Sequence, residues 1–389
     1  MPLLRFYTEG LDHSALAHIP LVPLIHGIFR GLETKESDFN PWRYRFNDYW
    51  QNSSRYLTFS GDLASCDLVV LPYDWYWARG PHWRQRYADP VVAPVVATLN
   101  QQLYDKAVAA GKPVVLFFTG DRSHEAVPFP KAIILREGLY QSRRQAQEFV
   151  CPAFAEDLLQ QVTQVNPSLT AGEVVIRPKT DRPTVGFCGL AKPITLKKQV
   201  KDLYYHGSML VSQGSWDVSP HLGEKLRIKA IKRLKSNPNL QTNFIVRSES
   251  VFLGASPDQK KIFRQDYIQN LIESDYILCC RGSGNYSFRL YETLSMGRIP
   301  LFLNTDSAFP YDFLQDWQQY CVWVEPKELK SLPEKVLAFH NALSAQDFID
   351  LQQRCRQFWL EWLSVQGFFS QFHHHLSHLG LIPAPTPES

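Results

Sequence analysis

The sequence predicts an α/β protein built on parallel sheets, and three observations point to that class. Short apolar runs bounded by turn residues recur along the chain, and helical patterns lie between them, which is the alternation typical of parallel sheets covered by helices. This alternation stops in a polar segment at 166–184 and then restarts. At 389 residues the chain is longer than one typical core, so two domains are expected.

Composition and charge exclude several classes of partner. Hydrophobic residues make up 44% of the chain and charged residues 20%, and a net charge of +3 is too small to indicate a nucleic-acid or membrane partner. The seven cysteines form no C-x-x-C pair, so we expect reduced, buried thiols. The first residues lack the pattern of a secretory signal, and the longest apolar runs are shorter than a membrane span. These features predict a cytoplasmic protein.

The first half is predicted to form a Rossmann-like domain over residues 1–176. Residues 19–50 show neither helical nor strand periodicity, whereas 90–110 shows a helical pattern. The expected strands are 68–71, 114–118 and 132–135. Asp74 and Asp121 follow two of these strands, so their carboxylates are expected at the carboxyl edge of the sheet.

The second half is predicted to form another Rossmann-like domain over residues 177–345. Strands are expected at 184–188 and 243–247, with a helix at 263–274. A helix at 223–235 carries the basic residues Lys225, Arg227, Lys229, Lys232, Arg233 and Lys235. These side chains form a solvated face, or Arg227, which neighbours the buried stripe, binds a phosphate. We expect a helical tail over 346–380 that packs back on the domains, and a disordered end at 381–389.

The central feature of this half is a strand, loop, helix and strand between Asp275 and Pro310. An apolar run at 276–280 precedes Arg281-Gly282-Ser283-Gly284, a helical pattern covers 287–296, and a second apolar run covers 299–303. The loop is thus expected at the carboxyl end of a strand, where ligands bind in doubly wound sheets. Backbone N–H groups at a helix N-terminus favour anions such as phosphates.

Known phosphate loops of other classes do not fit this stretch. Gly282 and Gly284 begin a G-x-G pattern, but Ser287 stands at the third glycine position, and no Walker lysine follows. Arg289 is too far beyond Cys280 for thiol-phosphatase chemistry. His373, His374, His375 and His378 have no acidic or cysteine neighbour in sequence. We therefore expect neither a metal nor a cofactor.

The pattern Ser287-x-Arg289-x-x-Glu292 places its charged residues on one face of the expected helix. A guanidinium can grip a diphosphate through several donors, and a carboxylate suits the paired hydroxyls of a ribose. The alternative is a surface ion pair contributing roughly 0.3–0.5 kcal/mol. Asp306, which follows the second strand, could either contact a ligand or cap a turn.

The same stretch resembles the exostosin-like glycosyltransferases, particularly their bacterial members. The resemblance is carried by residues 275–284, by Ser287-x-Arg289-x-x-Glu292-x-Leu294-x-x-Gly297-x-Ile299-Pro300, and by Asp306, Pro310-Tyr311 and Asp316-Trp317. It implies a GT-B fold, with two Rossmann-like domains facing across a cleft. It further implies that the C-terminal domain holds a nucleotide sugar, that the N-terminal domain contacts the acceptor, and that transfer inverts the anomeric carbon.

From this resemblance we expect a metal-independent glycosyltransferase. It would move a sugar from a nucleotide-diphosphate donor to a glycan or other hydroxyl acceptor, in polysaccharide or glycoconjugate synthesis. Membrane association would come only through such an acceptor. The expected donor-binding residues are Arg281, Gly282, Ser283, Gly284, Ser287, Arg289, Glu292 and Asp306. Asp121 and Asp74 are the candidate bases, with His26 behind them. The alternatives are a fucosyltransferase-like GT-B enzyme and a catalytically silent nucleotide- or carbohydrate-binding protein of the same fold.

Overall fold

The chain was analysed as a computed structural model that describes residues 4–30, 55–78, 89–123, 125–191, 200, 222–247 and 256–382. It divides into two compact units. The first unit comprises Met1–Phe154, Ala308–Tyr311 and Val365–Ser389, and the second comprises Ala155–Ser307 and Asp312–Ser364. No helix within the described ranges has both the length and the apolar character needed to cross a bilayer.

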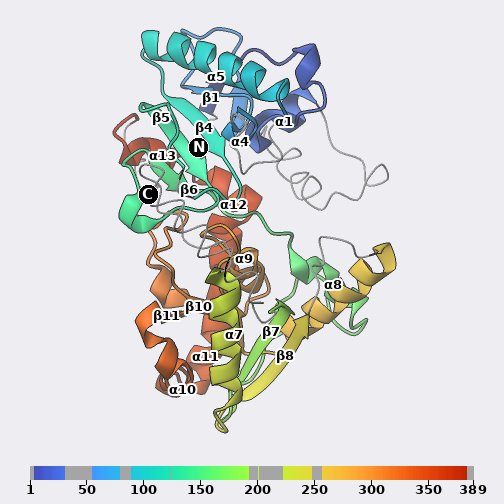
Figure 1. Cartoon of the computed structure of the whole chain (residues 1–389). Helices are drawn as coiled ribbons and strands as arrows, with labels where there is room; N and C mark the ends of the chain where they lie inside the picture. Colours follow the sequence, from blue (N-terminus) through green and yellow to red (C-terminus); the bar gives the residue numbers. More distant parts are fainter. Residues whose placement is uncertain are drawn as a thin grey trace, which may run out of the picture. The chain divides into compact units, whose positions relative to one another are not determined.

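The first unit is built on a six-stranded sheet in which every strand pair is parallel (Figure 1). Its strands lie in the order β2-β1-β3-β4-β5-β6. They are β1 (Leu4–Tyr7), β2 (Leu57–Phe59), β3 (Leu68–Val70), β4 (Val114–Phe118), β5 (Ala132–Arg136) and β6 (Glu148–Val150). Its helices are α1 (Pro23–Phe29), α4 (Trp75–Ala78), α5 (Val92–Ala109), α12 (Val365–Ser370) and α13 (His373–His378), with short 3-10 turns at Ser14–Leu16 and Gln141–Arg143.

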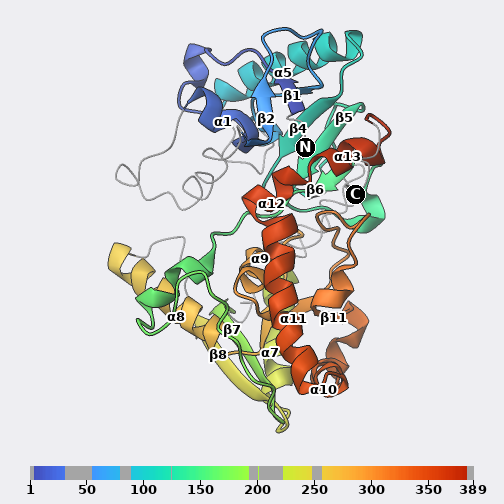
Figure 2. The same ribbon diagram turned by 180° about the vertical axis from the view of Figure 1, so that it is seen from behind.

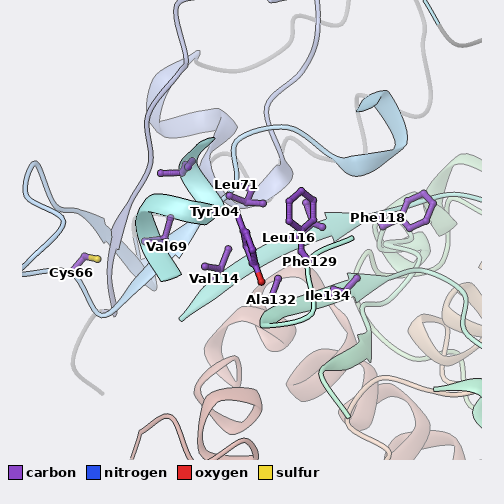
Figure 3. Packing of buried hydrophobic residues seen from close by; sticks show 12 residues of the cluster. Cys66, Val69, Leu71, Tyr104, Val114, Leu116, Phe118, Phe129, Ala132 and Ile134 are labelled. Atoms are coloured by element: carbon purple, nitrogen blue, oxygen red, sulfur yellow. The ribbon is translucent and has the colours of Figure 1, made fainter. Parts of the chain in front are cut away.

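A buried cluster packs α5 against the middle strands of this sheet (Figure 3). β4 and β5 are buried along their whole length, which is why both read as continuous apolar runs. Phe129 closes the cluster, because its ring meets the edge of Trp75 at a centroid distance of 5.0 Å and lies 4.8 Å from Tyr104. This packing fixes the strands whose carboxyl ends carry Asp74 and Asp121.

The second unit is built on a five-stranded sheet, again with every pair parallel. Its strands lie in the order β11-β10-β9-β7-β8. They are β7 (Thr184–Leu190), β8 (Gln241–Arg247), β9 (Tyr276–Cys279), β10 (Ile299–Leu303) and β11 (Val322–Val324). The helices are α7 (Leu222–Lys235), α8 (Pro257–Ile272), α9 (Phe288–Ser295), α10 (Leu332–Ala342) and α11 (Ala345–Phe358), with a π turn at Trp359–Leu363 and 3-10 turns at Leu158–Gln164, Trp317–Tyr320 and Pro326–Ser331.

Both sheets have the doubly wound strand order. In each, the second strand lies on one side of the first, and the third strand lies on the other side. The direction of winding therefore switches between β1 and β3 in the first unit, and between β7 and β9 in the second. In the second unit, α7 and α11 lie on opposite faces of the sheet (Figures 1 and 2). The predicted α/β class with two Rossmann-like units, the composition of a GT-B fold, is confirmed.

The boundary between the units differs from the predicted one at 176/177. The division falls between Phe154 and Ala155. Residues just after it belong to the second unit because their carboxylates hold its helices: Glu156 pairs with Arg264 of α8, and Asp157 pairs with Arg356 of α11 at 2.7 Å. The expected tail is also divided. Helix α11 belongs to the second unit, and α12 and α13 belong to the first. Residues 383–389 of the expected disordered end lie outside the described ranges.

Arg298 holds the base of the second unit together from a fully buried position. Its Nε donates to the carbonyl of Leu271 at 2.8 Å and its Nη2 to that of Val175 at 2.6 Å, and Nη1 lies 3.2 Å from Oε1 of Gln352. Burial, with a smaller effect of Arg177, lowers the pKa of this guanidinium to about 9. Segment 155–176 is therefore tied to the second unit at both ends, although its composition resembles a linker.

Candidate functional site

The loop after β9 is shaped by its own arginine. The backbone N–H of Gly282 donates to the carbonyl of Tyr286 at 3.0 Å, which closes the loop. Arg281 is buried, and its guanidinium donates to the carbonyl of Ser283 at 2.8 Å and to Oδ1 of Asn285 at 3.3 Å. Arg281 therefore fixes the loop conformation as well as placing positive charge at the strand end.

Asn285 joins this loop to the one after β10. Its buried side chain accepts a hydrogen bond from the Thr305 hydroxyl at 2.6 Å and donates to the Asp306 carbonyl at 3.0 Å. Asp306 has a φ of 61°, a left-handed conformation that Asp tolerates in turns, and its side chain is exposed. The geometry around Asp306 thus matches the turn interpretation, and Asn285 is an organising residue that sequence reasoning missed.

Arg289 lies in the first turn of α9, directly above the end of β7. Its Nη2 donates to the carbonyl of Cys188 at 2.7 Å, and its guanidinium carbon lies 4.5 Å from the ring centroid of Phe187. Its Nε is buried and has no hydrogen-bond partner among the described residues. Ser287 is the N-cap residue of α9, but its side chain makes no capping hydrogen bond. The helix therefore begins beside a held guanidinium that retains unused hydrogen-bonding capacity.

Two glycines allow this close arrangement. A Cβ added at Gly189 would lie 2.6 Å from Nη2 of Arg289, so the glycine leaves room for the guanidinium. A Cβ added at Gly223 would lie 2.2 Å from the Arg281 carbonyl oxygen, so the start of α7 packs directly on the loop after β9. A Cβ added at Gly282 would meet nothing within 4 Å. Sequence reasoning assigned no role to Gly189 or Gly223, because both roles depend on segments distant in the chain.

Arg227 reaches the same place from α7. Its Nη2 donates to the carbonyl of Arg281 at 2.7 Å and its Nη1 to the carbonyl of Leu190 at 3.2 Å. Its Nε is buried and finds no partner in the part of the chain that the structure describes. Burial lowers the pKa of Arg227, and the neighbouring Arg289 guanidinium lowers it further. Arg227 was predicted to lie on a solvated face or to bind a phosphate, and its contacts exclude the solvated face.

The arginines give this strand edge a concentrated positive charge. Burial raises the pKa of the Cys280 thiol, and Arg227, Arg281 and Arg289 all act in the opposite direction, which places the guanidinium groups around one buried sulfur. Within the described residues, neither Arg227 nor Arg289 forms an ion pair with a carboxylate. Cations that lie largely out of water are normally paired, and Arg227 and Arg289 are partly buried, so the arrangement can bind an anion.

Glu292 and Arg289 both contact Tyr267 of α8. The Tyr267 hydroxyl donates to Oε2 of Glu292 at 2.6 Å, and the Arg289 guanidinium lies 5.9 Å from the Tyr267 ring centroid. Arg264, on the same helix, lies 3.7 Å from Oε1 of Glu292. Glu292 is thus oriented by two residues that sequence reasoning did not identify. Tyr267 could have been noticed only as a polar aromatic residue in an amphipathic helix.

The predicted donor-binding residues all lie in the second unit, on the β9–α9 connection or just after β10. The structure brings Arg281 and Arg289 together at the ends of β7 and β9. Ser283 is exposed and Gly284 is buried in the same loop. Glu292 lies one helical turn further along α9, and Asp306 lies across Asn285 on the neighbouring loop.

The candidate bases belong to the first unit. Asp74 is buried, and its carboxylate accepts hydrogen bonds from the Thr119 hydroxyl at 2.7 Å, the Thr119 N–H at 3.1 Å and the Tyr76 N–H at 2.7 Å. Such bonds fix the orientation of the Asp74 carboxylate at the end of β4. Asp121 is exposed just beyond β4. Nδ1 of His26 accepts a hydrogen bond from the Leu21 N–H at 3.1 Å, so this ring is anchored within the unit.

Glu137 is a buried carboxylate at the same sheet edge that sequence reasoning did not propose. It follows β5, and its Oε2 accepts a hydrogen bond from the Gly120 N–H at 2.8 Å. Burial raises the pKa of the Cys151 thiol well above its usual range, and Glu137 and Asp74 raise it further, so both carboxylates lie near one sulfur. Glu137 and Asp74 therefore hold successive residues, Gly120 and Thr119, at the end of β4.

Comparisons with known proteins give limited likeness. No protein-family model matches the chain. Exostosin-1 of Drosophila melanogaster is 29% identical over 102 residues, which is 26% of this chain and 13% of that protein. The chain thus matches only a small part of the length of this relative.

Solved structures similar to the chain include two glycosyltransferases. A glycosyltransferase from Rickettsia africae ESF-5 is 11% identical, with 97% of this chain and 98% of that chain covered and a TM-score of 0.37. The catalytic domain of starch synthase IV from Arabidopsis thaliana, bound to ADP and acarbose, is 11% identical, with 91% and 80% covered and a TM-score of 0.32. TM-scores this low carry no functional argument, so function must be inferred from the site itself.

Proposed function

We propose that the protein is an inverting, metal-independent glycosyltransferase of the bacterial exostosin-like type, which moves a sugar from a nucleoside diphosphate to a hydroxyl of a glycan or glycoconjugate. The observation that carries this proposal is the arginine site at the β7–β9 switch point. There, Arg227 and Arg289 lie partly buried beside the loop of Arg281, and each has a buried Nε–H without an acceptor among the described residues. The short match to exostosin-1 and the motif around Arg289 point to the same family.

The arginine site suits the leaving group of such a reaction. Breaking the bond between the sugar and the diphosphate builds negative charge on the phosphate oxygens. Guanidinium groups already held by backbone carbonyls need no reorganisation to stabilise that charge, and they supply the positive charge that a divalent metal provides elsewhere. Arg289 and Arg281, with the loop at Gly282, Ser283, Gly284 and Ser287, would bind the diphosphate.

Glu292 would hold the ribose of the donor. A carboxylate with two acceptor oxygens can receive hydrogen bonds from both ribose hydroxyls. The Tyr267 hydroxyl and Arg264 fix the direction of this carboxylate, so little rotamer entropy would be lost on binding. Asp306, whose backbone carbonyl accepts a hydrogen bond from Asn285, would also contact the donor.

Inversion requires the acceptor hydroxyl to attack from the face opposite the leaving group, and a base assists in many enzymes. Asp121 is the stronger candidate of the two proposed carboxylates. It is exposed beyond β4, whereas Asp74 is engaged by Thr119 and the Tyr76 N–H and holds the strand end. Asp121→Asn should lower kcat by about a hundredfold with little change in donor KM, and an unchanged kcat would remove Asp121 as the base.

A nucleotide-sugar screen tests the proposed function. UDP-, GDP-, ADP- and dTDP-sugars are added separately, and thermal unfolding is followed, because a ligand that binds only the folded protein raises Tm. A stabilising donor is then incubated with glycan acceptors in EDTA, and the anomeric configuration of the product is read by NMR. We expect transfer with inversion in EDTA. A retained anomeric configuration, or activity that EDTA abolishes, would contradict the mechanism.

The same screen separates the alternatives. Turnover of GDP-fucose alone would indicate a fucosyltransferase-like enzyme. Donor binding without hydrolysis or transfer would indicate a silent binding protein, and no stabilisation by any nucleotide sugar would overturn the proposal.

A further inference from the structure

Arg227 lies at the edge of the second unit's sheet where buried N–H donors have no acceptor among the described residues. Its guanidinium bridges the carbonyls of Leu190, at the end of β7, and Arg281, just after β9. These are the neighbouring strands between which the winding direction switches. In doubly wound sheets, ligands bind outside the carboxyl ends of the strands at this point. Arg227 therefore lies where a ligand is expected, although it comes from the middle of a helix.

Two cations meet at this edge from opposite sides of the sheet. Arg227 comes from α7 and Arg289 from α9, which packs with α11 on the face opposite α7 (Figures 1 and 2). Each is held by a backbone carbonyl through an Nη atom, and each has a buried Nε–H for which the described residues provide no acceptor. Burying an unsatisfied donor costs free energy, and such groups in native proteins call for a specific explanation.

The charge balance indicates what would satisfy these donors. Arg227 and Arg289 are close enough for their repulsion to contribute to the lowered pKa of Arg227, after burial. Burial opposes a raised pKa of Arg289, to which Tyr267, Cys279 and Glu292 contribute, but no carboxylate of the described residues forms an ion pair with either arginine. A single carboxylate or phosphate offers one centre of negative charge. A diphosphate offers two adjacent centres with several oxygens, which matches two cations that approach from different directions.

We propose that Arg227 binds the diphosphate together with Arg289, and that this pair makes the site selective for a diphosphate over a single phosphate. The inference rests on the proposed function and extends it, because it assigns a donor-specificity role to a residue of α7 outside the β9–α9 motif. It further means that a nucleoside diphosphate left after transfer binds more tightly than the corresponding monophosphate.

The test compares inorganic pyrophosphate with inorganic phosphate, so that the result does not depend on the unknown nucleoside. Binding of each to the full chain is measured by isothermal titration calorimetry, for wild type and for Arg227→Gln. Wild type should prefer pyrophosphate, and the variant should lose about tenfold or more of its pyrophosphate affinity with little change for phosphate. The matched control is Arg233→Gln, which removes the same charge from an exposed position on the same helix and should leave both affinities unchanged.

Arg227→Lys guards against an effect on folding, because it keeps the charge while losing the planar fork that spans two carbonyls. If Arg227→Gln does not unfold cooperatively, Arg227→Lys takes its place, with a smaller but measurable loss of pyrophosphate preference. Wild-type pyrophosphate affinity in a folded Arg227 variant would overturn the inference while leaving the proposed function intact. Failure of the wild-type protein to bind pyrophosphate or any of UDP, GDP and ADP would overturn both.

Discussion

The two sheets share one strand order but fill their switch points differently. Between β1 and β3 of the first unit, the Tyr73 hydroxyl lies on the carbonyls of Gly10 and Leu11 at 3.3 and 3.4 Å. Arg30 adds its guanidinium, whose Nη2 donates to the Leu11 carbonyl at 3.1 Å and whose Nη1 donates to the carbonyl of Ile19. These groups satisfy each other there, although the buried hydroxyl of Thr8, just after β1, has no partner among the described residues. Between β7 and β9, it is two cationic groups, Arg227 and Arg289, that each keep a buried N–H without an acceptor in the described part of the chain.

The carboxylates at the two sites also differ in how many of the chain's own hydrogen bonds hold them. Asp74 is held by the backbone and side chain of Thr119 and by the Tyr76 N–H. Glu292 accepts one short hydrogen bond, from Tyr267, and lies 3.7 Å from Arg264. The comparison teaches that a switch point alone does not identify a ligand site. Unmet cationic donors are the feature that sets the second switch point apart, and they support our proposal that the second unit binds the donor.

The largest effects are expected from replacing one arginine at each switch point, Arg289 in the second unit and Arg30 in the first. Arg289→Gln should lower kcat/KM for transfer by about a hundredfold or more, because it removes a cation from the developing charge of the leaving group. Its Tm should change little, since the Arg289 side chain makes only one hydrogen bond to the protein. Arg30→Gln should do the opposite and lower stability by about 2 kcal/mol or more, because several buried carbonyls lose their donor.

Both variants are measured by thermal unfolding and by donor kinetics well below the transition temperature. The kcat/KM of Arg30→Gln should then stay within about threefold of wild type, because its partners are structural. A hundredfold loss of activity in Arg30→Gln with an unchanged Tm would show that the first switch point also serves the reaction. Wild-type activity in Arg289→Gln would remove the second switch point from the mechanism.

A smaller effect is expected from Gly189→Ala, which alters the same arginine without removing it. The new Cβ would lie 2.6 Å from Nη2 of Arg289, and Gly189 has a positive φ of 151°, so the guanidinium must shift from the Cys188 carbonyl. Donor KM should rise about tenfold, since misplacing a binding group costs part of its interaction energy. Gly61→Ala is the matched control, because its Cβ would enter open space and it lies in the first unit, outside the proposed donor site. Equal donor KM values for the two variants would contradict this positioning of Arg289.

Much of the second unit was predictable because its elements carry strong local signals. The apolar run of β9, the loop from Arg281 and the apolar stripe of α9 each read directly from sequence. The strands β1, β2, β6 and β11 did not. In β1 and β2 only one residue is buried, and β6 begins with the charged Glu148, so these strands lack the continuous apolar run that reveals the equally short β3.

The site itself was only half visible in the sequence, because strand order is a property of the fold. That Arg227 meets the Arg281 carbonyl follows from β7 and β9 being neighbours, which no local pattern encodes. The contacts of Asn285 with Thr305 and Asp306 likewise join separate loops. The misplaced domain boundary has a similar cause. The polar segment at 166–184 resembles a linker, but its Val175 carbonyl accepts a hydrogen bond from buried Arg298, and its Arg177 pairs with Asp275 just before β9.

The smallest expected effect tests how Glu292 is held. Tyr267→Phe removes the hydroxyl that donates to Glu292 and leaves the ring near Arg289, so the ribose-binding carboxylate becomes less well oriented while the diphosphate site persists. Affinity for the nucleoside diphosphate identified in the donor screen should fall by about fivefold, the usual weight of one hydrogen bond. The same substitution should lower the affinity for the 2′-deoxy form of that nucleotide much less, because this form lacks the 2′-hydroxyl that would donate a hydrogen bond to Glu292. Both affinities are measured by calorimetry.

Tyr320→Phe is the control in the same unit, since that ring stacks on Phe358 with a centroid distance of 4.0 Å. An equal loss for the ribose and deoxyribose nucleotides would mean that Tyr267 supports Arg289 rather than the ribose contact of Glu292.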